Sequence, residues 1–171
     1  MPESRRLDSS EVADAIQRLA QAIRNRQGDS RDVYLLGIAN GGVELARRIA
    51  RQVPNRGVGS VDVSFHRDDI GRHPIPKEFA PTLIPGDVNG AHVILVDDVL
   101  FSGRTVKAAL DELFDHGRPE KVELAILVDR GGRKLPFSAD YLALTLEAPA
   151  TGKVHVYLDP ADPAKDFISV R

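Results

Sequence analysis

One pattern occurs three times in this chain and constrains its fold more than any other feature. A short, mainly apolar run, typical of a buried strand, is closely followed by glycine or charged residues; the runs are residues 33–38, 91–96 and 122–128. Helical spacing of apolar residues resumes after the first two runs. Because strands that alternate with helices are joined by right-handed crossovers, the sequence predicts an α/β fold whose central, mainly parallel sheet is flanked by helices.

The N-terminal region predicts a further helix. Apolar residues at three- and four-residue spacing indicate a helix over residues 8–26, which Asp8 or Ser9 can cap and Gly28 can end. The helix that follows Thr105 is expected to stop near residues 117–119.

Three shorter segments predict additional strands. Strict alternation over residues 60–65 indicates a strand, and residues 141–144 and 154–157 are expected to be edge strands. Residues 66–89 hold many charges, prolines and glycines without clear periodicity, so we expect a long loop or hairpin with a functional role.

Composition limits the class of protein. The 171 residues carry 23 Lys+Arg against 25 Asp+Glu, and 42% are hydrophobic, which suits one domain over residues 1–171. No run approaches the roughly 18 apolar residues of a membrane span, and the N-terminus lacks the apolar core of a signal peptide, so a cytoplasmic protein without membrane contact is expected. The net charge of −2 argues against non-specific binding of nucleic acids, although a local basic face is compatible with it.

The ends of the three apolar runs carry the residues that suggest chemistry. In an open parallel sheet, ligands bind beyond the carboxyl ends of the strands. Ser102-Gly103-Arg104-Thr105 would place hydroxyls and backbone amides at a helix start, where anions such as a phosphate monoester bind. The adjacent Asp97-Asp98 could accept hydrogen bonds from vicinal hydroxyls or hold water around Mg²⁺, so a sugar phosphate would fit. The alternative is that the acids only cap the helix and Ser-Gly is an ordinary turn.

Residues 93–105, VILVDDVLFSGRT, closely resemble the phosphoribosyl pyrophosphate (PRPP) signature of type I phosphoribosyltransferases. The form of the signature is that of the PyrR family, which combines pyrimidine-operon attenuation with uracil phosphoribosyltransferase activity. Similar stretches in the same order extend the resemblance over residues 7–141. It implies a type I phosphoribosyltransferase fold with a small flexible hood, assembled as a homodimer or higher homo-oligomer.

The resemblance also implies a role for individual residues. Asp97 and Asp98 would hold the ribose hydroxyls of PRPP as catalytic residues. The 5-phosphate would lie in the loop after them, formed by Phe101, Ser102, Gly103, Arg104 and Thr105.

The remaining parts of the substrates would contact three other segments. Asn40 and Gly41 would bind pyrophosphate, and Arg67, beside Asp68-Asp69, would act in the flexible hood as a further catalytic residue. Val128, Asp129 and Arg130 would face the base.

The implied reaction converts uracil and PRPP to UMP and pyrophosphate, with Mg²⁺ bound mainly through PRPP. The five histidines lack metal-ligand spacing, so no site held by protein ligands alone is expected. Phe101 stands where many purine-transferring relatives have an acid, which favours a pyrimidine. The alternatives are a phosphoribosyltransferase for another base, or a non-catalytic regulator that senses PRPP or a nucleotide such as UMP or UTP and binds a messenger leader.

Two departures from the family pattern bear on these alternatives. The pyrophosphate loop reads Ala39-Asn40-Gly41 where a basic residue is usual, so a charge-assisted contact is missing and activity is expected to be reduced or lost. Gly132 and Ser138 replace a histidine and an arginine associated with the RNA-binding face, so specific binding of an RNA leader is expected to be weak or absent.

Overall fold

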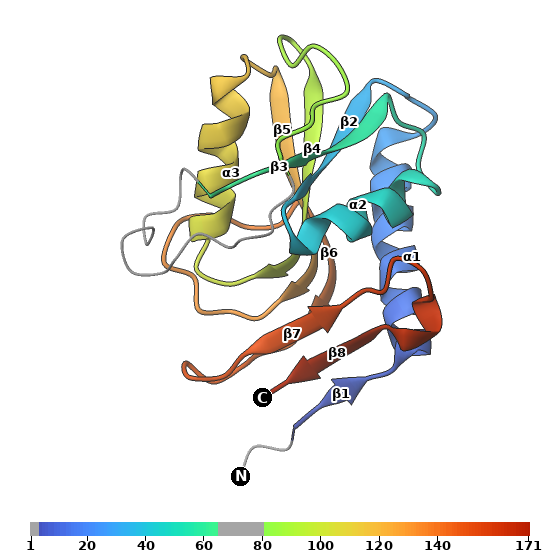
Figure 1. Cartoon of the computed structure of the whole chain (residues 1–171), viewed down its shortest axis with the longest axis vertical. Coiled ribbons are helices and arrows are strands. Elements are labelled where there is room, and N and C mark those ends of the chain that lie inside the picture. The colour runs from blue at the N-terminus through green and yellow to red at the C-terminus, as the bar shows by residue number, and fades with distance from the viewer. Residues whose placement is uncertain (1–3, 65–80) are drawn as a thin grey trace.

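A computed structural model describes residues 4–64 and 81–171 of the chain. Its centre is a five-stranded sheet with the order β3-β2-β4-β5-β6, in which every pair of neighbours is parallel (Figure 1). The strands are β2 (Val33–Ile38), β3 (Gly57–Val61), β4 (His92–Leu100), β5 (Lys121–Asp129) and β6 (Tyr141–Thr145). This confirms the α/β class predicted from the alternation of strands and helices.

Three helices cover the two faces of this sheet. They are α1 (Ser9–Gln27), α2 (Gly41–Ala50) and α3 (Arg104–Asp115). Alternate residues of β2 separate two cores: Leu35 packs with α1 and α2, and Leu36 packs with α3. Two-sided burial explains why the central strands have continuous apolar runs in place of strict alternation.

The limits of α1 follow from its capping residues. The Asp8 carboxylate accepts from the Glu11 amide at 3.0 Å, and the Glu11 carboxylate accepts from the Asp8 amide at 2.9 Å, which forms a capping box. Gly28 ends the helix with a φ of 61°. α1 is 19 residues long and lacks the apolar stretch that a membrane span requires, as do the other helices of residues 4–64 and 81–171.

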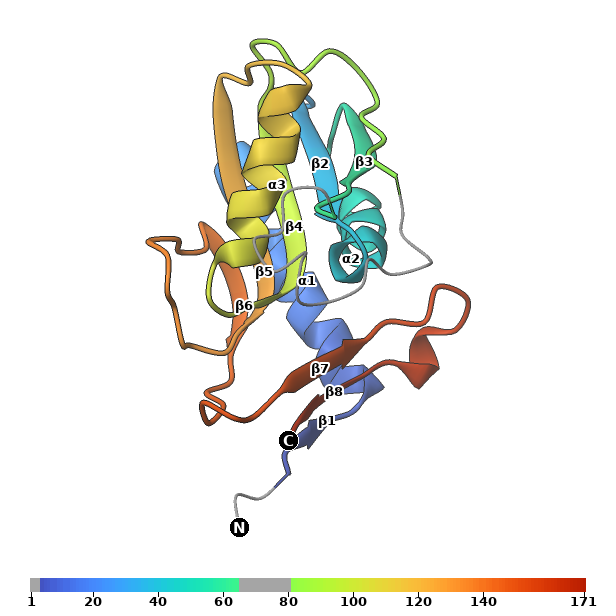
Figure 2. The same cartoon turned by 60° about the vertical axis from the view of Figure 1, so that its left-hand side comes forward.

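A second, antiparallel sheet joins both ends of the described chain. Its order is β1-β8-β7, with β1 (Arg6–Leu7), β7 (Val154–Tyr157) and β8 (Phe167–Val170); the short 3-10 helix η1 (Pro163–Lys165) precedes β8. Figures 1 and 2 show it beyond the carboxyl ends of the central strands. Residues 154–157 form an edge strand, as expected, and the sheet to which they belong is this small one.

The strand predicted over residues 60–65 was misplaced. β3 pairs with β2 only from Gly57 to Val61. The chain then turns because the Asp62 carboxylate accepts from the Ser64 amide at 3.0 Å and from its hydroxyl at 2.6 Å. β4 also differs from its prediction, since it continues past residue 96 to Leu100.

Only part of the predicted long loop is described. Leu83 forms an isolated antiparallel bridge with Ser60, with N–O distances of 3.0 and 2.8 Å. The catalytic role expected for Arg67 in a flexible hood falls on a position outside the described residues.

Candidate active site

The candidate site lies where β2 and β4 separate. β2 leads through α2 to β3 on one side, while β4 lies on the other side of β2. The two strands pair until Gly37 and Val96; beyond that point β4 pairs only with β5. The order of strands reverses here, and such a switch point is the usual ligand site in an open α/β sheet.

Two glycines bring the start of α2 against β4. A methyl group built on Gly41 would lie 2.6 Å from the carboxyl carbon of Asp98, and one on Gly42 would lie 2.9 Å from the carbonyl carbon of Val96. Asn40, preceded by a cis peptide bond, occupies the N-cap position without a capping hydrogen bond from its side chain. The positive end of α2 therefore lies against Asp98 at the carboxyl end of β4, the edge where ligands bind in the crevice of an open α/β sheet, and this arrangement suits an anion.

Asp97 and Asp98 form the carboxylate pair of the crevice. Asp97 is 6% exposed, and its Oδ1 accepts from the Asp98 amide at 2.9 Å. The Asp98 Oδ1 accepts from the Val99 amide at 2.8 Å. Burial raises the pKa of Asp97 well above its ordinary value, and the neighbouring Asp98 carboxylate raises it further. Within residues 4–64 and 81–171 neither carboxylate has a basic side chain as an ion-pair partner, so oxygen atoms remain available for a ligand.

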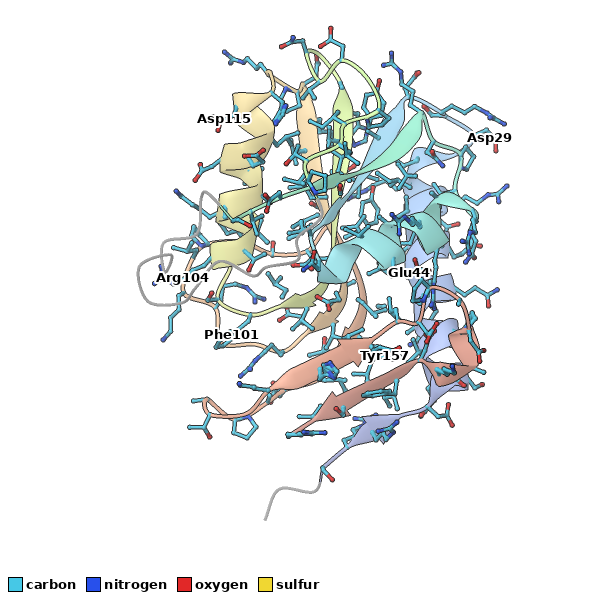
Figure 3. All side chains as sticks on the ribbon, viewed as in Figure 1. Asp29, Glu44, Phe101, Arg104, Asp115 and Tyr157 are labelled. Atoms are coloured by element: carbon cyan, nitrogen blue, oxygen red, sulfur yellow. The ribbon has the colours of Figure 1, made fainter. Side chains whose placement is uncertain are left out.

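The loop after β4 enters α3 through a left-handed residue. Gly103 has a φ of 93° and precedes Arg104, whose amide donates to the Ser102 hydroxyl at 3.2 Å. The Ser102 carbonyl accepts from the amides of Lys134 and Leu135, both at 2.9 Å. Figure 3 shows Phe101 and Arg104 on the left and Glu44 of α2 on the right of the carboxyl ends of the central strands. The structure thus places the predicted phosphate loop at a helix start, across from the predicted pyrophosphate turn.

The residues predicted to face the base have other partners. The Val128 side chain is fully buried in the core. The Arg130 guanidinium donates to the carbonyls of Gly152 at 2.6 Å and Pro149 at 3.0 Å, and lies 3.9 Å from the centre of the Phe101 ring. Asp129 accepts from the Gly131 amide at 2.9 Å. Any contact of Val128 or Arg130 with a base would therefore use the main chain.

Sequence reasoning missed two arginines that hold this region together. Arg133 donates to the Phe101 carbonyl at 2.5 Å and to the Asp129 carboxylate at 2.6 Å. Arg48 of α2 pairs with Asp166 and donates to the Asp159 carbonyl at 2.7 Å, which ties the small sheet to the helix that begins at the pyrophosphate turn. The four-residue spacing of Asp129 and Arg133 was the available signal for the first; the second is a contact between distant positions.

Comparisons with known proteins agree with this geometry. A model of the phosphoribosyl transferase domain matches residues 5–156. The bifunctional protein PyrR of Streptomyces coelicolor is 48% identical over 91% of this chain and 83% of its own length. That of Chloroflexus aurantiacus is 41% identical over 99% and 96%, respectively.

Solved structures show the same fold. A hypoxanthine-guanine phosphoribosyltransferase from Bacillus anthracis superposes with a TM-score of 0.68 over 96% of each chain at 18% identity. The hypoxanthine phosphoribosyltransferase of Trypanosoma cruzi gives 0.67 over 96% of this chain and 94% of its own at 20% identity. The resemblance inferred from residues 93–105 is confirmed, and the chain belongs to the PyrR family of phosphoribosyltransferases.

Proposed function

We propose that this phosphoribosyltransferase acts on uracil and PRPP to form UMP and pyrophosphate, and that it takes part in the regulation of pyrimidine genes. The observation that carries the proposal is the approach of Gly41 to Asp98, because it brings the start of α2 against the carboxylates that directly precede the Ser102 loop on β4. PRPP has three groups that match these elements: two phosphate ends and a ribose with vicinal hydroxyls.

Each element has one part of PRPP as its partner. The Ser102, Gly103, Arg104 and Thr105 segment binds the 5-phosphate through hydroxyl and amide donors. Asp97 and Asp98 accept from the ribose hydroxyls. The amides that follow Asn40 bind pyrophosphate without the basic side chain usual in the family, so we expect weaker binding of the leaving group.

Charge development explains how such a crevice can catalyse the transfer. The bond from the anomeric carbon to the pyrophosphate oxygen breaks, the bond from that carbon to a uracil nitrogen forms, and the nitrogen releases its proton. Positive charge develops on the sugar close to Asp97 and Asp98, while negative charge develops on pyrophosphate at the positive end of α2. No covalent nucleophile is required.

The donor set fits Mg²⁺ that is held mainly by the substrate. Among the described residues no group of three or more acidic or histidine side chains forms a metal cage. Asp97 and Asp98 nevertheless offer carboxylate oxygens beside the pyrophosphate turn, and Mg²⁺ prefers oxygen ligands from water and substrate phosphates. When bound, the ion would offset the charge of the leaving pyrophosphate.

The choice of uracil rests on the PyrR relatives and on Phe101. This ring is 42% exposed and occupies the position at which many purine-transferring relatives have an acid. Separate incubations of PRPP with radiolabelled uracil, hypoxanthine, guanine and orotate test the choice. We expect UMP from uracil alone. Product from a purine alone would contradict uracil, and no product from any base would favour a sensor of PRPP or nucleotides.

The regulatory activity has its own test because the RNA-binding positions differ in this chain. Gly132 has a φ of 79°, and a methyl group there would lie 2.6 Å from Cε2 of Phe101, so a histidine at this position would have to displace that ring. We expect weak binding of the native pyrimidine leader at this face. A gel shift against a scrambled hairpin, with and without UMP at near-physiological salt, measures it; tight UMP-dependent preference for the native leader would contradict this expectation.

Two further proposals concern the architecture. The chain forms a single domain, since Leu7 and Ile168 of the small sheet belong to the same core as α1 and the central sheet. It also assembles as a homo-oligomer, as the family resemblance implies; sedimentation velocity measures this directly.

A further inference from the structure

The small sheet presents one face made of aromatic and basic side chains. Arg6 and His155 lie opposite Ser169 on its two sides, and Tyr157 lies opposite Phe167. Side chains directly opposite each other, or two residues apart along a strand, share a face of a sheet. These five residues therefore form one surface, which we call the ring face.

The ring face is the open side of the small sheet. The other side, which includes Leu7 and Ile168, is buried in the core that contains α1. Figure 2 shows α1 passing behind β7 and β8. Arg6, His155 and Tyr157 are exposed, and 39% of Tyr157 is accessible.

The rings are in direct contact. The centre of the Phe167 ring lies 5.5 Å from both the His155 and the Tyr157 ring, and the Arg6 guanidinium carbon lies 4.0 Å above it. The Tyr157 hydroxyl donates to Asp159 at 3.0 Å, which holds its ring in place. A group of rings fixed on the surface of a sheet provides flat surfaces on which bases can stack.

A buried hydroxyl at the centre of this face has no partner. Ser169 is 7% exposed, and its Oγ forms no hydrogen bond within residues 4–64 and 81–171. A buried polar atom without a partner is unfavourable and unusual in a native protein. Because Arg6 and His155 flank it, movement of either side chain toward a ligand would open this hydroxyl to the same ligand.

Positive charge borders the rings at one end. The Lys153 amide donates to the Arg171 carbonyl at 2.8 Å, and the Arg171 amide donates to the Lys153 carbonyl at 2.9 Å. Lys153 is two residues from His155 and Arg171 is two residues from Ser169, so both side chains lie on the ring face. With Arg6, three cations border the rings at one end, while Asp159 lies at the other. If two copies of the chain met symmetrically through this face, the cations of one copy would lie close to those of the other and repel them. The negative charges of a phosphate backbone complement these cations.

We propose that the ring face binds single-stranded nucleic acid, separately from the substrate crevice. Bases stack on the exposed Tyr157 and His155 rings, which Phe167 supports, and Arg6, Lys153 and Arg171 contact phosphates. Recognition by stacking tolerates many sequences, because every base has a π-face.

Fluorescence anisotropy with labelled oligo-uridine and oligo-thymidine tests the proposal on the full-length protein. We expect Tyr157→Ala to weaken binding at least about fivefold, in line with the loss of one stacked base. Tyr157→Phe is the matched control, because it keeps the ring and removes only the hydroxyl. Lys153→Gln should reduce the salt dependence of binding, and Lys153→Arg should preserve it. Preference for the RNA strand over the DNA strand would show that the 2′-hydroxyl takes part.

Several outcomes would overturn the proposal. Binding of neither oligonucleotide, or equal affinity of the Tyr157→Ala and Tyr157→Phe proteins, would show that bases do not stack on this ring. Displacement of the oligonucleotide by PRPP or UMP would place the binding in the substrate site. A change of oligomeric state in the Tyr157→Ala protein would show that the ring face contacts a second copy of the chain. Transfer of phosphoribose to uracil is expected to be unchanged in all four variants, since neither Tyr157 nor Lys153 is among the residues to which PRPP or uracil is assigned. Failure of the transferase proposal would therefore be observed separately from failure of this one.

Discussion

Two carboxylates on neighbouring strands of the central sheet have opposite surroundings. Asp97 lies near the carboxyl end of β4 and Glu123 near the amino end of β5, and they are 6% and 4% exposed. The Asp97 carboxylate accepts from one backbone amide and faces another acid, so burial and Asp98 raise its pKa. Two carboxylates with similarly low exposure therefore have different electrostatic surroundings at the two ends of one sheet.

The Glu123 carboxylate, in contrast, has several hydrogen-bond partners. Its oxygens accept from Arg26 at 2.9 Å and Gln27 at 3.0 Å, contact His92 at 2.6 Å, and accept from the Tyr141 hydroxyl at 3.1 Å. Burial by itself would raise the pKa of Glu123, but His92, the charge of Lys121 and Tyr141 outweigh burial and lower it.

The difference separates a stabilising cluster from a functional one. A buried carboxylate surrounded by donors contributes to the folded state, because its charged form is favoured there. A buried carboxylate left beside a like charge lowers stability, and such groups are concentrated where a ligand supplies the missing partners. The comparison therefore supports a stabilising role for the Glu123 cluster and agrees with the ligand-binding role that we propose for the Asp97 pair.

The largest expected effect is the loss of Glu123. Glu123→Ala leaves Tyr141, His92 and Gln27 without their shared acceptor and should reduce the free energy of unfolding by about 3 kcal/mol. Urea denaturation measures this loss. Glu120→Ala, at an exposed position nearby, is the control and should change it by less than about 0.5 kcal/mol. Equal effects of the two substitutions would remove the stabilising role of the cluster.

Asp98→Asn should weaken binding of PRPP with little change in stability. It removes a charged acceptor for a ribose hydroxyl, which is worth about 1.5–3 kcal/mol of binding free energy. Isothermal calorimetry with PRPP and Mg²⁺ measures the change, and Asp111→Asn, at an exposed ion pair of α3, is the matched control. Unchanged affinity in the Asp98 variant would exclude Asp98 from the site.

Asp97→Asn should stabilise the fold, in contrast to the change at Glu123. The amide keeps the acceptor for the Asp98 amide and removes a buried charge beside Asp98, so we expect a gain of about 1–2 kcal/mol near neutral pH, together with loss of transfer activity. Because the folded-state pKa of Asp97 is raised, the wild-type protein loses stability as pH rises through that pKa. The gain should therefore grow with pH and vanish in acid, where both forms are neutral. A gain independent of pH in thermal unfolding would show that charge is not its cause.

The sequence predicted the carboxyl end of β4 better than the Glu123 cluster. Residues 93–105 are contiguous, so the strand, the two acids and the helix start after them could be predicted together and the family recognised, whereas Glu123 appears only as one acid within an apolar run. The Arg48–Asp166 pair joins positions 118 residues apart, and β1 is two residues long, which is too short for periodicity to detect. Contacts that depend on tertiary folding left no local pattern.

The smallest expected effect, Tyr141→Phe, tests the comparison through pH. The phenol donates to Glu123 and accepts from Gln27 at 2.7 Å, so its loss should cost about 1 kcal/mol of stability. The hydrogen bond from Tyr141 is one of the interactions that lower the pKa of Glu123. Because these interactions favour the ionised carboxylate, they stabilise the folded protein only at pH values where Glu123 is ionised. The cost should therefore be largest at about pH 7.5 and shrink toward about pH 4, where the unfolded-state carboxylate gains its proton. Urea denaturation at the two pH values checks this trend. Tyr141→Phe should destabilise the protein more as pH rises, whereas Asp97→Asn should stabilise it more as pH rises. Both trends together would show that the two buried carboxylates affect stability in opposite directions. A cost of Tyr141→Phe that does not depend on pH would reduce the role of the Tyr141 hydroxyl to packing.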